Sequence, residues 1–411
     1  MKNLIANFLL LGFGVCVGLL IAEGCVRLFF PHPSYGAPKG LYRLNKDRDY
    51  ELAPNFKGIF RSPEFYSHII TNSHGLRDRE YESKTEDVFR IMIIGDSFTF
   101  GHGCELEDSF TKILESNLNE SSYKDYKYVE VVNAGVGGYG VDHYYLHLKE
   151  MFGIYKPDLV VLSFFIGNDI GPRLGLRTVW DGYLVDKNSI PFRNQVKGEI
   201  ASLSNGFLKM KALLAQHSHL FNFIVTKVKH SRKIKAFFNS TGMAAGEEFK
   251  KIKNLALQEK KKEYDKKKER NKNVSTYFQK YLMTPTLLFE KDWQYSRNLI
   301  EKISLFLSER NVEFFIAFLP DRMQVHKEYW GNVLWQQNFD QNDFNLENIN
   351  KRFSDFCTTK SIGCVDMLPE FKKQAQSDKR LYFKNDAHWN SVGHRLAADI
   401  LTSSLKKILE N

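Results

Sequence analysis

Cysteine is scarce in this 411-residue chain, which contains only five. Five cysteines are too few for a disulfide scaffold, and no paired CxxC spacing indicates a zinc site. The hydrophobic share of 43% and the charged share of 26% are ordinary for a chain that buries a core. The many Phe and Tyr residues exclude wholesale disorder. A folded protein of more than one common domain length is therefore expected.

Two well-known motifs each lack one required residue. The stretch 135–140 fits the pattern GxGxxG, but a dinucleotide site also needs an acidic residue about 20 positions later. The next apolar run ends at Asp169, which is too far along the chain. His143 and His147 are four residues apart, yet the zinc motif HExxH requires a glutamate where Tyr144 stands. These residues therefore predict neither a dinucleotide site nor a metal site.

A long apolar run from Leu4 to Ala22 lies near the N-terminus. About 19 such residues are enough to span a bilayer as a helix. We expect a signal anchor at residues 1–30, with a cleaved signal peptide or a buried core helix as alternatives. Basic residues on both sides leave the membrane orientation open. An anchor followed by so long a chain most simply places the rest outside the cytoplasm, in the periplasm or the extracellular space.

Cys357 and Cys364 are close together in the sequence, so they are candidates for a disulfide. An exported domain could bridge them, because disulfides persist in oxidising compartments. Two independent thiols are the equally open alternative.

The formal net charge of +10 is concentrated in one segment. Residues 200–272 contain 18 Lys and Arg against 6 Asp and Glu, whereas the rest of the chain carries a net charge of −2. No nucleic-acid-binding motif accompanies this charge, so we expect no nucleic-acid partner. An anionic membrane or glycan surface suits the apolar and basic interleaving better, and a solvated face is the alternative.

Five continuous apolar runs predict strands that are buried on both faces of a mainly parallel sheet. Helical patterns separate the runs, as in a doubly wound α/β fold. The predicted strands are 88–94, 128–132, 159–166, 312–319 and 362–365, and the predicted helices are about 106–118, 140–152, 294–309, 345–358 and 391–409.

Two segments depart from this alternation. Residues 31–85 are rich in turn formers and predict an irregular N-terminal extension. Residues 172–290 predict a basic helical insertion, which interrupts the main domain of residues 86–411 between its third and fourth strands.

Ser97 follows the first predicted strand directly, within Gly-Asp-Ser. A serine at a strand-to-helix turn projects its hydroxyl above the sheet edge, but it needs a base to become a nucleophile. Near the C-terminus, Asp386 precedes His388 by two residues, a spacing that allows a carboxylate to orient an imidazole. Helix caps are the alternative interpretation of both motifs.

Hydrogen-bond donors are expected close to Ser97. Gly138 lies in the glycine-rich loop after the second predicted strand, and Asn168 follows the third. The carboxyl ends of parallel strands meet at one sheet edge, where ligands bind. Acyl transfer through a tetrahedral intermediate needs such donors, because negative charge develops on the carbonyl oxygen.

These four blocks resemble the SGNH (GDSL-type) hydrolase family: Ser97 in GDS, Gly138 in NAGxxG, Asn168 in GND and His388 in DxH. They occur in the family's order, and the resemblance covers about 88–170 and 294–409 but not the insertion. It implies a flavodoxin-like three-layer α/β/α sandwich with a five-stranded sheet, and no metal or organic cofactor. The Asp-x-His-Trp tail is also similar to that of alginate-type O-acetyltransferases. The stretch 72–77 and the anchor look like those of membrane-anchored bacterial SGNH proteins.

The resemblance assigns roles to individual residues. It implies Ser97 as nucleophile, His388 as base and Asp386 as the residue that orients it. The oxyanion hole would combine the N–H groups of Ser97 and Gly138 with the side-chain amide of Asn168. The candidate pocket-lining residues are Phe98, which stands where the family usually has Leu, together with His102, Asp169 and Trp389.

The implied function is serine-dependent hydrolysis of an ester through an acyl-enzyme. The substrate would carry an O-acetyl or other short acyl group, on a glycan or a lipid. One alternative is an O-acyltransferase that acts on a cell-envelope polysaccharide, because the acceptor depends on whether water is excluded. A second alternative is a catalytically silent carbohydrate-binding module with the same fold.

Overall fold

The computed structural model describes residues 2–29, 36–121, 123, 126–189, 214, 218–230, 274–337, 339–377 and 380–410. The chain divides into two compact units. One comprises residues 1–36 and 191–273, and the other comprises residues 37–190 and 274–411. Most of the basic segment 200–272, including its Lys/Glu-rich end, lies outside the described residues.

The first unit contains helices α1 (Lys2–Phe29) and α7 (His219–His230). Within α1, the 20 residues Leu10–Phe29 are long and apolar enough to cross a membrane. Most of the large apolar side chains of this stretch are exposed, so α1 is not a buried core helix.

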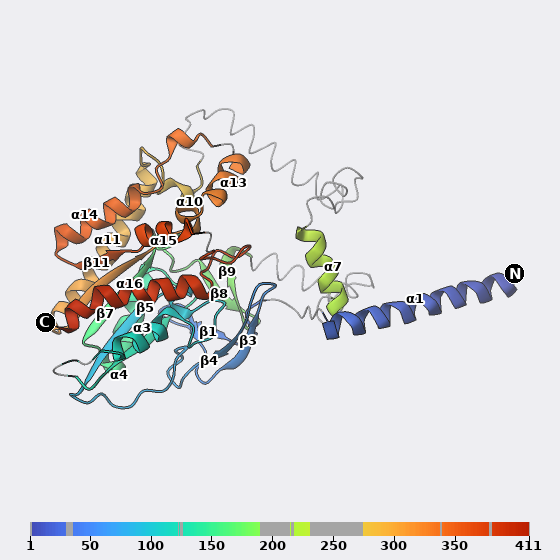
Figure 1. The fold of residues 1–411 in the computed structure, drawn as a ribbon, viewed down its shortest axis with the longest axis horizontal. Helices are drawn as coiled ribbons and strands as arrows, with labels where there is room; N and C mark the ends of the chain where they lie inside the picture. The colour runs from blue at the N-terminus through green and yellow to red at the C-terminus, as the bar shows by residue number, and fades with distance from the viewer. Residues whose placement is uncertain are drawn as a thin grey trace. The chain divides into compact units, whose positions relative to one another are not determined.

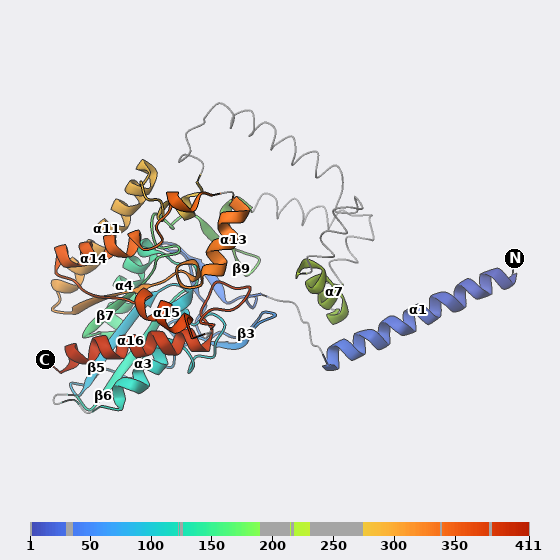
Figure 2. The same cartoon turned by 45° about the horizontal axis from the view of Figure 1, so that its top comes forward.

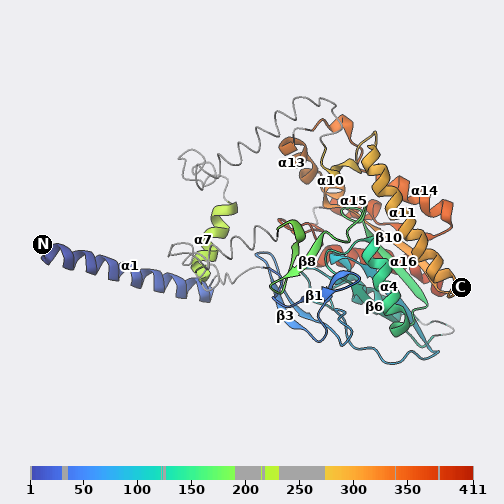
Figure 3. The same ribbon diagram turned by 180° about the vertical axis from the view of Figure 1, so that it is seen from behind.

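One charged residue joins the two helices of this unit. The carboxylate of Glu23 accepts hydrogen bonds from the Ser218 hydroxyl at 2.7 Å and from the backbone N–H groups of His219 and Leu220 at 2.8 and 2.9 Å. Glu23 thereby satisfies free donors at the first turn of α7, which otherwise have no partner within that helix. Figures 1, 2 and 3 all show α7 against the C-terminal end of α1.

A five-stranded parallel sheet forms the centre of the second unit (Figure 1). Its strands lie in the order β11-β10-β7-β5-β6, and every neighbouring pair is parallel. Counted along the chain, this is the order 2-1-3-4-5 of flavodoxin-like folds, so the predicted fold class is confirmed. The strands are β5 (Val88–Gly95), β6 (Tyr128–Gly135), β7 (Leu159–Phe165), β10 (Glu313–Leu319) and β11 (Gly363–Asp366).

Helices cover both faces of the sheet. Side chains alternate between the faces along each strand. In β5, Ile91 and Ile93 pack with α3 (Phe110–Asn119), α15 (Leu368–Ala375) and α16 (Ser391–Leu409), of which α3 and α16 are seen in Figure 2. Met92 and Ile94 pack with α4 (Val141–Tyr155), α11 (Leu287–Ser308) and α14 (Asn348–Lys360), which are seen from behind in Figure 3.

The N-terminal extension is more regular than the sequence predicted. Residues 42–70 form two antiparallel hairpins instead of an irregular segment: β1 (Tyr42–Asn45) with β2 (Asp49–Leu52), and β3 (Lys57–Arg61) with β4 (Tyr66–Ile70). The strands have only four or five residues each, too few to establish a clear alternating pattern in the sequence.

The insertion also begins and ends differently from the prediction. A hairpin of β8 (Arg177–Trp180) and β9 (Tyr183–Asp186) replaces the expected helix, and η1 (Lys187–Ser189) follows it. Helix α10 (Thr276–Gln279) and the start of α11 already belong to the second unit. The remaining short elements of the second unit are α2 (Ser97–Phe100), α12 (Arg322–Val325), α13 (Lys327–Gln337) and η2 (Gln341–Asp343).

Candidate active site

Ser97 is the first residue of α2, two positions after the end of β5. Asp96 caps this helix, since its carboxylate accepts the backbone N–H of Phe98 at 2.9 Å. No side chain fits at Gly95, where a Cβ would lie 2.1 Å from the Thr99 hydroxyl oxygen. The tight turn therefore fixes Ser97 at the carboxyl edge of the sheet.

His388 lies within hydrogen-bond reach of Ser97, with 2.7 Å between Nε2 and the serine Oγ. Its Nδ1 lies 2.5 Å from Oδ1 of Asp386, which also accepts the His388 backbone N–H at 2.9 Å. Burial alone would raise the pKa of Asp386, but the nearby His102 and His388 imidazoles hold that pKa well below its usual range. The three side chains Ser97, His388 and Asp386 have the connectivity of a catalytic triad.

The loop after β6 runs beside the nucleophile. A Cβ on Gly137 would lie 4.0 Å from the Cβ of Ser97, and Gly138 adopts a left-handed φ of 84°. In the part of the chain that the structure describes, the N–H groups of Ser97 and Gly138 donate to no protein acceptor. Both are therefore available to an oxyanion formed next to Ser97.

Asp96, which the sequence interpretation did not select, organises the third expected donor. Its Oδ2 accepts a hydrogen bond from the Asn168 side-chain amide at 3.0 Å. Burial raises the pKa of Asp96 to about 6, so the carboxylate is ionised at neutral pH. An amide nitrogen carries two hydrogens, and among the described residues only Asp96 accepts one from Asn168. The only sequence signal for this role was the position of Asp96 within GDS.

Two tyrosines from the N-terminal extension cover the glycine loop. The Tyr50 hydroxyl donates to the Gly137 carbonyl at 3.2 Å. The Tyr42 hydroxyl would lie 2.7 Å from a Cβ on Gly137, and burial raises its pKa to about 12, so it stays neutral. No local pattern indicated either contact, because both tyrosines are far from the loop along the chain.

His102, a candidate pocket-lining residue, lies directly beside the triad. Its ring stacks on that of His388, with 4.0 Å between centroids and 28° between planes. Its Nε2 is 3.6 Å from Oδ2 of Asp386. The loop that carries His102 is thus part of the site.

Phe98, Asp169 and Trp389 do not line an open pocket, contrary to expectation, because their exposed fractions are 1%, 0% and 0%. The Phe98 ring supports His388, with 5.1 Å between centroids. Asp169 accepts a hydrogen bond from the Tyr144 hydroxyl at 2.9 Å, and burial raises its pKa. These three side chains therefore belong to the buried interior.

Donor atoms of His102, Asp386 and His388 lie within 4.8 Å of one another, a spacing that also suits a metal ion. The contacts of a serine triad with an additional stacked ring account for the same closeness. A protein-bound metal is therefore not needed to explain this arrangement.

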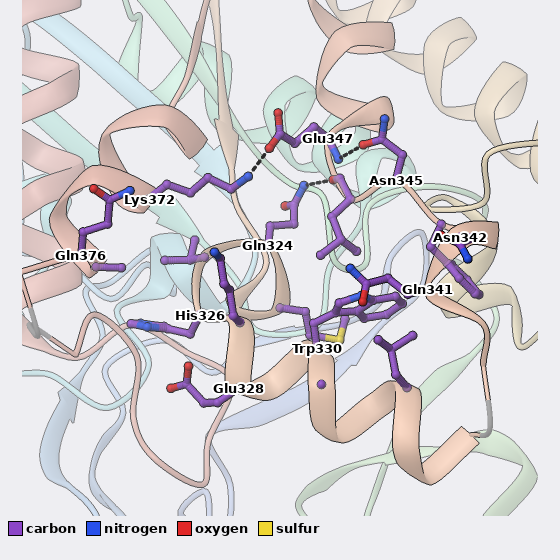
Figure 4. A pocket seen from close by; sticks show the side chains of 18 of the residues that line it. Gln324, His326, Glu328, Trp330, Gln341, Asn342, Asn345, Glu347, Lys372 and Gln376 are labelled. Atoms are coloured by element: carbon purple, nitrogen blue, oxygen red, sulfur yellow. Dashed lines mark hydrogen bonds and ion pairs between the residues drawn. The ribbon is translucent and has the colours of Figure 1, made fainter.

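A cavity of about 1230 Å³ lies apart from the triad, along α12 and α13 (Figure 4). Gln324, Trp330 and Asn345 are among its lining residues, and no triad residue is. The Tyr329 hydroxyl on α13 donates to the Lys384 carbonyl at 3.0 Å. Helix α13 thus connects the cavity wall to the loop that leads to the triad.

Residues 278–410 match a sequence family described as an SGNH hydrolase-like domain of the acetyltransferase AlgX. The match spans about a third of the chain, and it includes Asp386 and His388 but not Ser97. It confirms the resemblance to SGNH-type proteins that the four short motifs indicated. No curated protein matches the chain in sequence.

Several solved structures are similar to this chain at low sequence identity. They include an acetyl xylan esterase, AlAXEase, with 12% identity, a TM-score of 0.37 and coverage of 77% of this chain and 100% of the other. A G-D-S-L family lipolytic protein from Veillonella parvula DSM 2008 has 10% identity, a TM-score of 0.35 and coverage of 78% and 99%. The psychrotrophic esterase EstA from Pseudoalteromonas sp. has 10% identity, a TM-score of 0.36 and coverage of 78% and 99%.

Proposed function

We propose that the chain is an SGNH-type serine enzyme that cleaves acyl esters through an acyl-enzyme. The observation that supports this most directly is the continuous chain of contacts from Ser97 Oγ to His388 to Asp386. A lone GDS or DxH motif also occurs as a helix cap, but a cap does not require this contact across 291 residues. The complete set of groups argues against the catalytically silent binding module.

In the first half-reaction, Ser97 Oγ attacks the acyl carbonyl carbon while its proton passes to His388 Nε2. Negative charge moves to the carbonyl oxygen, which the N–H groups of Ser97 and Gly138 and the Asn168 amide stabilise. The ester C–O bond then breaks, and His388 returns the proton to the departing alkoxide. Asp386 keeps its charge throughout and stabilises the imidazolium.

The second half-reaction regenerates Ser97. A hydroxyl group attacks the acyl carbonyl carbon while its proton passes to His388. The bond between that carbon and Ser97 Oγ then breaks, and His388 returns the proton to Oγ. Water as the attacking group gives hydrolysis, whereas a sugar hydroxyl gives transfer. The match of residues 278–410 to an acetyltransferase family favours transfer to a polysaccharide as the second candidate.

The proposed location is outside the cytoplasm, with α1 as a membrane anchor. The basic segment 200–272 suits contact with an anionic membrane or glycan surface. Protease treatment of intact and permeabilised cells, read with an antibody against the C-terminal region, tests this placement. Cleavage only after permeabilisation of the inner membrane contradicts it.

Turnover of p-nitrophenyl acetate by the full chain in detergent tests the activity. The wild type should release nitrophenol and bind a fluorophosphonate covalently, and Ser97→Ala should do neither above background. Ser403→Ala is a matched control, since the Ser403 hydroxyl only donates to a carbonyl within α16. A wild type without turnover and without labelling contradicts the proposed nucleophile.

Acetyl transfer is tested by adding candidate polysaccharides to the same assay. Acetylation of the polysaccharide at the expense of free acetate supports a transferase. Free acetate as the only product, with every acceptor tested, supports an esterase.

A further inference from the structure

His102 occupies a position that the triad mechanism does not account for. Its imidazole stacks on His388 at 4.0 Å between centroids, on the ring whose other neighbour is Phe98 at 5.1 Å. Two rings, the phenyl of Phe98 and the imidazole of His102, therefore pack against the base. Such packing restricts the side-chain rotation of His388.

His102 also faces the carboxylate that orients the base. Oδ1 of Asp386 contacts His388, while Oδ2 lies 3.6 Å from Nε2 of His102. That Nε2 is buried and has no hydrogen-bond partner among the described residues. A buried polar atom without a partner is costly, and Asp386 is the acceptor that a small movement would bring into reach.

Hydrogen bonds from Arg77 hold the loop that carries His102. This fully buried guanidinium donates to the carbonyls of Phe100, Gly101 and Cys104 at 2.6 to 3.0 Å. Residues 101 and 103 are both glycines with φ of 78° and 88°, a conformation that other residues rarely adopt. The rigid turn therefore presents His102 in one orientation, and the stretch 72–77 that ends in Arg77 contributes to the site through this contact.

Residues of the N-terminal extension also pack around the His102 ring. Phe60 and Phe65 meet the His102 ring edge-on, with centroids 4.7 and 5.1 Å away. The His102 side chain is only 14% exposed. A less hydrated environment strengthens the contact between His388 and Asp386.

We propose that His102 is a positioning residue that holds the His388 imidazole by stacking and engages the second oxygen of Asp386. This inference rests on the proposed function, in which His388 is the base. His102 is not a second base: burial and the neighbouring His388 lower its pKa to about 4 despite Asp386, so it is neutral at pH 7. A neutral ring can stack on the imidazolium that forms in the reaction without repelling it.

Three substitutions separate the two contributions. His102→Ala removes both the stack and the Nε2 group, whereas His102→Phe keeps the stack and His102→Gln keeps an N–H donor. We expect kcat for p-nitrophenyl acetate to fall at least about 10-fold in His102→Ala, because small misplacement of a catalytic group is costly. We expect His102→Phe and His102→Gln each to retain more of kcat than Ala does. KM should change less than about 2-fold in all three, since the acyl site is untouched.

Each variant is titrated with the fluorophosphonate so that kcat refers to folded, labelled protein only. His68→Ala is the matched control, because this histidine lies in the N-terminal extension, is 58% exposed and contacts Glu105 instead of the triad. It should retain wild-type kcat. A proton NMR resonance of the His388 Nδ1–H, shifted downfield by Asp386, should persist in His102→Phe and broaden in His102→Ala.

Wild-type kcat in His102→Ala would overturn the proposal while leaving the proposed function intact. Equal losses in Ala, Phe and Gln would also overturn it, because neither stacking nor the donor would then contribute. An inactive wild type that the fluorophosphonate does not label would instead refute the proposed function.

Discussion

The guanidinium of Arg177 occupies the space that a side chain on Gly138 would need. A Cβ built on Gly138 would lie 2.5 Å from Arg177 Nη1 and 2.9 Å from the Tyr50 hydroxyl oxygen. The donor loop after β6 is therefore enclosed by two hairpins. Hairpin β1–β2 precedes the loop in the sequence, and hairpin β8–β9 follows it. Both the positive φ of Gly138 and this close packing exclude larger residues.

Gly138→Ala should displace the loop and lower kcat/KM for p-nitrophenyl acetate at least about 10-fold, because one oxyanion donor moves. Strain at the left-handed position should also reduce the free energy of unfolding by about 1 to 3 kcal/mol. Gly153→Ala is the matched control, since a methyl group on Gly153 would meet nothing within 4 Å and its φ is not positive. Wild-type kcat/KM in Gly138→Ala would show that the Gly138 N–H does not contribute to the oxyanion hole.

Asp96→Asn should lower kcat by about 10- to 100-fold with little change in KM. The two carboxylate oxygens of Asp96 accept from Phe98 N and from the Asn168 amide, whereas an asparagine has only one acceptor oxygen. One donor therefore loses its acceptor. Steady-state kinetics normalised to fluorophosphonate labelling measures the effect. Full activity would show that Asn168 is held by other contacts.

The buried His394 should make the free energy of unfolding fall as the pH is lowered. Burial lowers its pKa to about 3, and its Nδ1 accepts the Phe110 backbone N–H at 3.3 Å. An unfolded histidine has a pKa near 6.5, so between about pH 6.5 and 3 the unfolded chain binds more protons, and stability falls as pH is lowered. From pH 7 to 4.5 this single group should cost about 2 kcal/mol.

His394→Gln should remove that part of the pH dependence. Urea unfolding at both pH values, followed by tryptophan fluorescence, reports on the second unit, because all five tryptophans lie in it. The difference in unfolding free energy between wild type and variant should shrink by about 2 kcal/mol on acidification. A constant difference would contradict the neutral buried state of His394.

Cys357 and Cys364 should form a disulfide under mild oxidation. Both are free thiols in the structure and belong to the same apolar cluster, and hydrogen bonding to Cys364 raises the pKa of Cys357. Closing so short a loop should stabilise the unit by about 2.5 kcal/mol. Peptide mass spectrometry in a Cys16→Ser/Cys25→Ser background should detect the loss of two hydrogens. Absence of that mass change after oxidation would refute the prediction.

The central sheet could be predicted because most residues of its longer strands are apolar and buried. The structure places β7 and β10 within one residue of the predicted runs. The hairpins of the extension could not be predicted, since their strands are short and only partly buried. Hairpin β8–β9 was likewise missed, because it lies at the start of a segment that was predicted to be helical as a whole.

At the site, the sequence indicated the groups that resemble known motifs but not the residues that hold them. Ser97, Asp386 and His388 were selected from their immediate neighbours in the sequence. Arg77 donates to distant backbone carbonyls, and Arg177 fills the space beside Gly138; no local pattern encodes either arrangement. Long-range packing decides such roles, and the structure was needed to identify them.

The 291-residue separation between Ser97 and His388 has a consequence for biosynthesis. During translation the nucleophile leaves the ribosome long before its base does, because the chain is made from the N-terminus. A nascent or prematurely terminated chain can therefore fold much of β5, β6 and β7 yet carries no activated serine. In the proposed mechanism, Ser97 gains its base only after residues 386–388 have been synthesised and have folded against it.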